Sequence, residues 1–258
     1  MDPIERIREQ LAVYLADPDP AEAYEYIARI DDILRSKPVP AATLPPAIER
    51  KVLDHGYVRL RAVFGDEAFI AESARQSTSG QSKGPELDGR LIRRLWRDGH
   101  TSPFEMASCT WDLKAPLFVV QQILRHRTGK FNQFSFRYSD GLKEGRQVDA
   151  ESPGIEWHIS DDVSPVAQGV MDEVVRNAVE AYRNLLDLGC KSEDARAVLP
   201  VNIYTRLRVQ FDVNNAMKFF RLRCADDVQA ETRAYANAMR ELMWPHFPNV
   251  MDEESQGE

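Results

Sequence analysis

Two stretches of the chain alternate between apolar and polar residues, and one long stretch repeats its apolar residues every three or four positions. Residues 57–64 (YVRLRAVF) and 201–211 (VNIYTRLRVQF) show the alternation that is typical of half-buried strands. Residues 168–188 have helical spacing and precede Gly189, which indicates an amphipathic helix that ends at the glycine. Its predicted apolar stripe consists of Met171, Val174, Val175, Ala178, Tyr182, Leu185 and Leu186.

Shorter patterns predict the other elements. Helical spacing covers residues 66–76, 86–98, 115–127, 192–198, 213–223 and a last segment from Asp226 to Trp244. Residues 106–113 favour a short strand. Residues 77–85 and 128–164 are predicted to be loops, and the acidic tail 251–258 is predicted to be frayed.

The first 47 residues differ from the rest of the chain. Residues 1–36 contain two stretches of helical spacing, and residues 37–46 (KPVPAATLPP) contain four prolines, as an extended linker does. We therefore expect a helical extension with a proline-rich linker over residues 1–47 and the main domain over residues 48–250.

Composition excludes several classes of protein. The chain has 258 residues, of which 43% are hydrophobic and 29% charged, as in ordinary globular proteins. No apolar run approaches the ~18 residues that a membrane span needs, and the charged N-terminus does not resemble a signal peptide. Three widely spaced cysteines (Cys109, Cys190 and Cys224) favour a reducing compartment over a disulfide framework. These features predict a cytoplasmic protein that does not bind membranes.

The distribution of charge predicts a local anion site. A net charge of −8 disfavours bulk binding of nucleic acid. Positive residues nevertheless concentrate in residues 125–137 and 206–223. No P-loop, dinucleotide fingerprint, nucleophile elbow or zinc-protease motif is present in the sequence.

Residues 125–138 (RHRTGKFNQFSFRY) carry the densest chemical signal. Cations are stabilised at the C-terminal end of a helix by about 0.3–1 kcal/mol, so a helix end is the simplest interpretation of the Arg-His-Arg triplet. Polar and aromatic residues then alternate, however, and no acidic residue occurs before Asp140. Donors of this kind are suited to a planar heterocycle and a phosphate.

This stretch resembles the signature of the flavin-dependent thymidylate synthases, which is Arg-His-Arg, seven residues and then Ser, here Arg125 to Ser135. Neighbouring segments resemble the family in the same order along residues 54–245. They are Ala74–Ser77 (ARQS), Gly99–Glu105 (GHTSPFE), Lys114–Pro116 (KAP), Ala195–Pro200 (ARAVLP) and Leu222-Arg223 followed by Gln229 and Glu231.

The resemblance implies an α/β fold in which a central, largely antiparallel sheet is flanked by long helices. It implies reductive C5-methylation of dUMP, with methylenetetrahydrofolate as the carbon donor, FAD as the hydride donor and NADPH as the reductant of the flavin. It also implies a homotetramer with shared active sites. Members of a divergent branch, from nucleoside-antibiotic pathways, methylate UMP instead.

The resemblance further assigns roles to individual residues. Catalytic roles fall to Arg125, Arg223 and Ser135. FAD contacts fall to Ser77, Ser102, Glu105, Arg125, His126, Arg127, Asn214 and Lys218. Nucleotide contacts fall to Gln122, Gln133, Phe134, Ser135, Phe136, Arg137, Arg196 and Arg223.

Each assignment has a structural alternative. In the structural alternative, Arg196 is a surface partner of Asp194, and Arg223 caps the C-terminal end of a helix. Ser135 is then a turn residue, and the phenylalanines of residues 125–138 belong to the hydrophobic core.

Four departures from the family pattern fall on the FAD side. The family usually has Asn at the position of Asp212 and Arg at that of Asn214. It usually has His or Asn at the position of Lys218 and His at that of Asp227. These departures leave the mode of FAD binding open, and they suit the UMP-methylating branch. Two non-catalytic alternatives remain. The aromatic and basic residues 125–138 suit a nucleotide- or RNA-binding protein, and the four departures suit a paralogue that has lost FAD.

Overall fold

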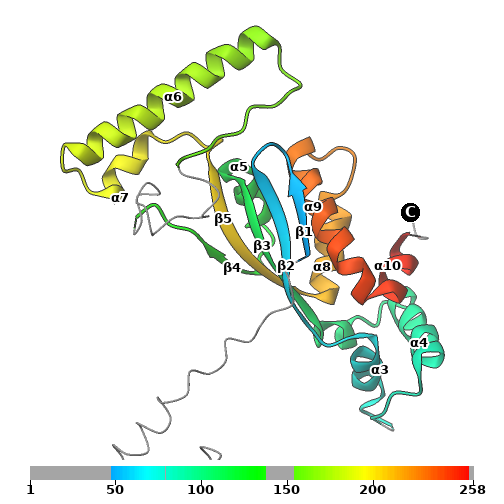
Figure 1. Ribbon diagram of the computed structural model, residues 1–258. Helices are drawn as coiled ribbons and strands as arrows, with labels where there is room; N and C mark the ends of the chain where they lie inside the picture. Colours follow the sequence, from blue (N-terminus) through cyan, green and yellow to red (C-terminus); the bar gives the residue numbers. More distant parts are fainter. Residues whose placement is uncertain (1–47, 79, 138–153, 256–258) are drawn as a thin grey trace, which may run out of the picture. The chain divides into compact units, whose positions relative to one another are not determined.

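The structure is a computed structural model that describes residues 48–78, 80–137 and 154–255 (Figure 1). The chain divides into two units, Met1–Pro45 and Pro46–Glu258, and all described residues belong to the second. The helices and linker predicted for residues 1–47 lie outside the described residues. Within the described residues, no helix is both long and apolar enough to cross a membrane.

A five-stranded sheet forms the centre of the second unit. Its strands are β1 (Ile48–Val52), β2 (Gly56–Phe64), β3 (Ser108–Pro116), β4 (Lys130–Gln133) and β5 (Tyr204–Asp212). The spatial order is β1-β2-β3-β5-β4, and every neighbouring pair is antiparallel. The fold is therefore α/β with an antiparallel sheet, which confirms the predicted class.

Three helices cover one face of the sheet: α5 (Leu117–Ile123), α8 (Val213–Arg223) and α9 (Ala230–Met243) (Figure 1). Alternate residues of the strands point into this layer, as the pleat requires. Trp111, Leu113 and Val209 are at most 1% exposed there and pack with Phe219 and Met239. This layer is the main hydrophobic core.

The other face of the sheet is polar. One cross-strand row runs through the register partners Glu49, Arg59, Asp112, Arg208 and Asn132, one from each strand. Asp112 accepts two hydrogen bonds from Arg208, at 2.6 and 2.8 Å, and Arg59 pairs with Glu49. Opposite charges on adjacent strands stabilise such rows.

The remaining helices lie at the two ends of the sheet. At one end are α3 (Glu67–Arg75), α4 (Pro85–Arg97), the 3-10 turn η1 (Ser102–Glu105), η3 (Trp244–His246) and α10 (Pro248–Ser255) (Figure 1). At the other end are α6 (Pro165–Asp187), α7 (Ser192–Ala195) and η2 (Arg196–Val198). A second, smaller core is formed by Val175, Val179 and Tyr182 of α6 with Ile155 and Ile203.

Some predictions from the pattern are confirmed. The strand over residues 57–64 is β2, the helix over residues 213–223 is α8, and Gly99 and Gly189 follow helix ends with positive φ angles of 73° and 84°. Glycine adopts this left-handed conformation without the steric cost that a Cβ brings.

Other predictions are wrong. β1 was not predicted, and β4 lies inside the loop expected over residues 128–164. Both strands are short, polar and at the sheet edges, so their pairing depends on distant residues rather than on local pattern. The tail expected to be frayed is helical through Ser255.

Two boundaries and one apolar stripe also differ from the prediction. The buried helix predicted over residues 115–127 is shorter, because β3 continues through Pro116 and α5 ends at Ile123. The last long helix begins at Ala230 with Gln229 as its N-cap, not at Asp226. The predicted stripe of α6 is partly misplaced, since Met171 and Val174 are 41% and 59% exposed while Val179 is buried.

Candidate active site

Arg223, the last residue of α8, is held by two contacts. Its Nε donates a hydrogen bond to Nε2 of His126 at 2.8 Å, and its Nη2 donates to the backbone oxygen of Gln122 at 3.3 Å. Gln122 is in α5 and His126 follows that helix, so the C-terminal ends of α5 and α8 meet at the guanidinium. Three residues that the sequence predicted as a site are therefore brought together.

His126 serves as a neutral acceptor in this group. Its Nε2 has to be unprotonated to accept from Arg223. Burial lowers the pKa of His126, and the positive charge of Arg223 lowers it further. The edge of its ring packs against Phe219, with ring centroids 4.8 Å apart, which fixes the orientation of the imidazole.

Gln229 extends this group to the start of α9. The side chain of Gln122 donates to Oε1 of Gln229 at 2.6 Å. Sequence reasoning used Gln229 only as part of a motif and gave it no role. The motif contains no information about a partner in α5.

A second group forms around Glu193 in α7. Nε of Arg137 donates to the Glu193 carboxylate at 2.8 Å, and Nε of Arg196 donates to the Glu193 backbone oxygen at 3.3 Å. Ser135 Oγ accepts from the backbone N–H of Arg137 at 3.2 Å. Three predicted nucleotide contacts, Arg137, Arg196 and Ser135, thus lie near one residue, Glu193, that sequence reasoning missed.

The aromatic residues between these two groups are partly exposed. The rings of Phe134 and Phe136 meet edge to face with centroids 5.1 Å apart, and Phe136 packs on Tyr182 of α6. The guanidinium of Arg206 lies over the Phe134 ring at 5.3 Å. Gln133 and Phe134 line a cavity on the polar face of the sheet, together with Arg206.

Four of the residues predicted to hold FAD, Ser102, Glu105, Asn214 and Lys218, belong to a third group, where η1 meets α8. Nδ2 of the buried Asn214 donates to Glu105 at 3.1 Å. Asp212 is the N-cap of α8, and both its carboxylate oxygens accept hydrogen bonds from Asn215, at 2.9 and 2.7 Å. Asp212, which departs from the family pattern, therefore serves as the N-cap at which α8 begins.

The donor set of this third group suits a flavin nucleotide. Ser102, Glu105 and Lys218 are exposed, and they supply a hydroxyl, a carboxylate and a cation. Asn214 Oδ1 is buried and has no hydrogen-bond partner among the described residues, which marks an unsatisfied acceptor at this place. Ser77, just past the end of α3, and Arg125 and Arg127, after α5, lie elsewhere on the unit.

The described unit is an α/β domain with an antiparallel sheet and with arginines at helix ends, an arrangement that suits a small anionic ligand. The family described as "Thymidylate synthase complementing protein" matches residues 59–249. The chain therefore belongs to the family of flavin-dependent thymidylate synthases.

Individual relatives agree with this assignment. The flavin-dependent thymidylate synthase of Thermus thermophilus is 38% identical over 205 residues, which are 76% of this chain and 74% of that protein. That of Thermosipho africanus is 34% identical over 196 residues, which are 73% of this chain and 86% of that protein.

Among solved structures, the crystal structure of the UMP/dUMP methylase PolB from Streptomyces cacaoi, bound with 5-Br dUMP, is similar to this chain. The TM-score is 0.66 at 28% identity, and the match covers 80% of this chain and 97% of that chain.

Proposed function

We propose that the chain methylates C5 of a uridine monophosphate, dUMP or UMP, with methylenetetrahydrofolate as the carbon donor, reduced FAD as the hydride source and NADPH as the reductant of the flavin. The names of the relatives and the ligand of the PolB structure support this class of reaction. The observation that carries the proposal is the fixed position of Arg223 between His126 and Gln122.

Arg223 stabilises the negative charge that develops on the uracil. C5 is nucleophilic when negative charge is shared between C5 and a ring carbonyl oxygen, as in an enolate, and a fixed guanidinium in a partly buried site stabilises that oxygen. The hydrogen bonds to His126 and to the Gln122 backbone orient the planar fork before substrate arrives. Pre-organisation of this kind avoids a reorganisation cost during the reaction.

Arg137, Arg196 and Ser135 bind the phosphate of the nucleotide. In support of this role, Arg137 already donates a hydrogen bond to an oxyanion, the Glu193 carboxylate, at 2.8 Å. Arg137 and Glu193 are 54% and 36% exposed, so their ion pair is weak and a phosphate competes for the arginine. Gln122, Gln133 and the backbone of Phe134 and Phe136 complete this binding surface.

Ser102, Glu105, Asn214 and Lys218 would hold FAD, together with Ser77, Arg125, His126 and Arg127. When bound, the flavin supplies the hydride that reduces the transferred carbon to a methyl group. Lys218 offers a cation to the pyrophosphate of the cofactor, and Ser102 offers a hydroxyl.

The cysteines of the chain suit a reaction without a thiolate nucleophile. Cys109 is 1% exposed in β3, and burial raises the pKa of its thiol to about 12. A thiol with that pKa is inert at neutral pH. Cys190 is exposed and Cys224 is half-buried, and neither belongs to a motif of the family.

We further propose that the protein is a cytoplasmic homotetramer, with the N-terminal extension as a separate appendage before a catalytic domain over residues 48–250. Support for assembly comes from α6, where Val166, Val170 and Val174 are 79%, 58% and 59% exposed. A row of exposed apolar residues on one helix is typical of an interface between subunits.

A non-catalytic paralogue that binds nucleotide without FAD is the second candidate. The burial of Asn214 and the engagement of Asp212 in a helix cap favour it, because the family's FAD side normally has other residues there.

One experiment separates the two candidates. The full chain is incubated with FAD, NADPH and methylenetetrahydrofolate, dUMP and UMP are offered separately, and the product is detected by mass. A gain of one methyl group on either nucleotide, absent with Arg223→Ala, supports the proposed reaction. Nucleotide binding with neither bound flavin nor methylated product would support the paralogue and contradict the enzyme.

A further inference from the structure

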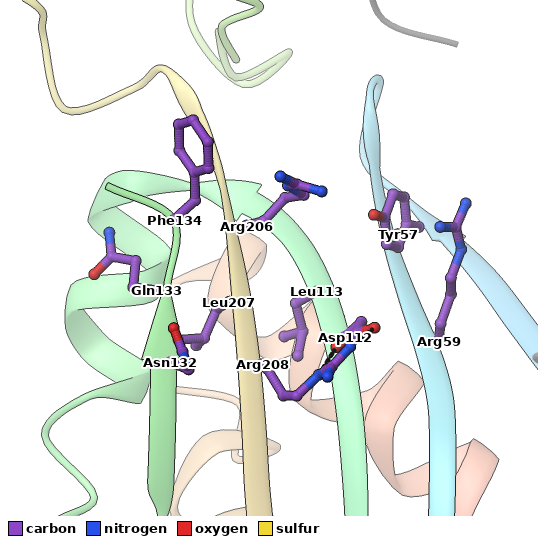
Figure 2. Close-up of a pocket in the computed structure, with 10 residues that line it drawn as sticks. All are labelled: Tyr57, Arg59, Asp112, Leu113, Asn132, Gln133, Phe134, Arg206, Leu207 and Arg208. Carbon is purple, nitrogen blue, oxygen red and sulfur yellow. Dashed lines mark hydrogen bonds and ion pairs between the residues drawn. The ribbon is translucent and has the colours of Figure 1, made fainter. Parts of the chain in front are cut away.

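The polar face of the sheet contains a cavity of about 350 Å³ whose central arginine, Arg206, has no role in the proposed reaction. The cavity is lined by Tyr57 and Arg59 of β2, Asp112 and Leu113 of β3, Asn132 and Gln133 of β4, Phe134, and Arg206, Leu207 and Arg208 of β5. In Figure 2 the side chains of Arg206, Arg208 and Asp112 project from the same face of the strands. The Arg223 group, by contrast, lies at the ends of the helices that pack on the other face.

The arginines of this cavity differ in how they are neutralised. Arg208 is paired through two hydrogen bonds with Asp112, and Arg59 is paired with Glu49. The Nε atom of Arg206 is buried and has no hydrogen-bond partner among the described residues. A buried donor without a partner is costly, so its retention calls for a ligand or another reason.

Arg206 is also held in place. Its guanidinium lies over the Phe134 ring at 5.3 Å, within the range of a cation–π contact. The backbone N–H of Phe134 donates to the backbone oxygen of Arg206 at 2.9 Å, so the ring and the arginine are tied to the same point of the sheet. A planar fork that is already ordered loses less entropy when it binds an anion.

The local charge favours an anionic ligand. Among the residues that line the cavity, Arg59, Arg206 and Arg208 are cations and Asp112 is a carboxylate. Three positive groups and one negative group leave a net charge of +2 on a chain whose total is −8. The side-chain amides of Asn132 and Gln133 add neutral donors at the rim.

We propose that this cavity binds the oxyanion of a ligand, a phosphate or a carboxylate, through the guanidinium of Arg206. The ring of Phe134 supports the arginine, and Arg208 remains on Asp112 while the anion is bound. The identity of the ligand rests on the proposed function, because three molecules of that reaction carry such a group. They are the nucleotide with its 5′-phosphate, the folate with its glutamate carboxylates and NADPH with its 2′-phosphate.

The first test measures the site without reference to catalysis. Inorganic pyrophosphate is titrated by calorimetry into the full chain, into Arg206→Gln and into Arg90→Gln, which removes an equal charge from the exposed surface of α4. We expect the affinity to fall about 10–100-fold in Arg206→Gln, as for the loss of charge-assisted hydrogen bonds, and to be unchanged in Arg90→Gln. Higher salt weakens the binding.

Further variants keep this test decisive. Arg206→Lys keeps the charge and loses the fork, so an intermediate affinity is expected even if Arg206→Gln does not fold, as judged by its thermal unfolding. The double variant Arg137→Gln, Arg196→Gln removes the other predicted anion site. Loss of all pyrophosphate binding in that double variant, or equal affinities of the full chain and Arg206→Lys, would overturn the proposal.

The second test identifies the source of the oxyanion. Affinities of the full chain and of Arg206→Lys are compared for UMP and dUMP, for folates with one and with five glutamates, and for NADPH against NADH. If Arg206→Lys has a lower affinity for only one of these pairs of compounds, the result supports the site and shows which ligand it binds. A loss for pyrophosphate alone supports the site and assigns it to another anion. Because pyrophosphate binding requires no turnover, it persists through Arg206 even if the proposed methylation fails.

Discussion

The two faces of the sheet use the same strands for different purposes. On the helix-covered face, Trp111 and Val209 are fully buried and pack with α8. On the polar face, their sequence neighbours Asp112 and Arg208 form an ion pair beside an open cavity. Burial of apolar area stabilises the fold on the first face, whereas charge on the second contributes little to stability and is available for ligands. Substitutions one residue apart in a strand therefore separate stability from binding.

The largest effect is expected from a pair of substitutions in β3. Trp111→Ala should lower the free energy of unfolding by about 3–5 kcal/mol, because it leaves a cavity in the core. Asp112→Ala, on the polar face, should lower it by about 1 kcal/mol or less, because the ion pairs lost are partly exposed. Urea unfolding followed by circular dichroism gives both values. Similar losses for the two variants would break the contrast between the faces.

Arg223 is the exception to this division, because it is a charged residue at the edge of the helix-covered side. Arg223→Ala should reduce the rate of methyl transfer about 100–1,000-fold, as the loss of a fixed electrostatic donor does. Its thermal unfolding should remain close to that of the parent protein. Arg221→Ala, two residues earlier in α8 and exposed, is the matched control and should retain activity. Near-normal turnover of Arg223→Ala would reject its catalytic role.

A substitution at Glu193 tests separately the residues that we propose to bind the phosphate of the nucleotide. Glu193→Gln removes the carboxylate that Arg137 holds at 2.8 Å. Because that pair is exposed, we expect nucleotide affinity to rise only about 2–5-fold. Equilibrium dialysis with dUMP and UMP measures the change. Weaker binding in this variant would mean that Glu193 contacts the nucleotide itself, for example through the ribose.

The sequence predicted the interior strands and helices better than the edges of the sheet. β2 and α8 have an apolar period that reports directly on burial, and both were located within one residue. β1 (IERKV) and β4 (KFNQ) are mostly polar, since each pairs with only one neighbour at the edge of the sheet. Their assignment depends on hydrogen bonds to distant strands, which no local pattern encodes.

The site shows the same limit. Motif spacing selected Arg223, His126 and Gln122, and the structure brings these three into contact. It did not select Glu193 or Arg206, to which no motif assigns a role. The contact of Glu193 with Arg137 and the position of Arg206 against Phe134 follow from packing between segments that are apart in the chain, which no local pattern encodes.

A smaller effect is expected in the pH dependence of stability. The pKa of His126 lies below its ordinary value, about 6.5, because the folded state buries the ring beside Arg223. As the pH falls through that value, the unfolded state binds a proton that the folded state does not. The free energy of unfolding therefore falls below about pH 6.5, until the lower folded-state pKa is passed. In His126→Gln this part of the slope should be absent when denaturant unfolding is compared between about pH 7.5 and 5.5. An unchanged slope would contradict the contact.

An effect as small as that of Glu193→Gln concerns the flavin side. Asp212 and Asp227 place carboxylates where the family has neutral or basic residues, and a carboxylate near a pyrophosphate is repulsive. Asn caps helices about as well as Asp, so Asp212→Asn should leave α8 intact. Asn214→Arg is unsuitable, since Asn214 is only 1% exposed and a buried charge would destabilise the fold.

We expect Asp212→Asn combined with Asp227→His to tighten FAD binding about 2–5-fold at low salt, and less at high salt, because exposed charges are screened. Fluorescence titration of FAD at two ionic strengths measures this. Tight binding by the unmodified chain, with no gain in the double variant, would show that the hydrogen bonds from Asn215 already hold Asp212 away from the cofactor.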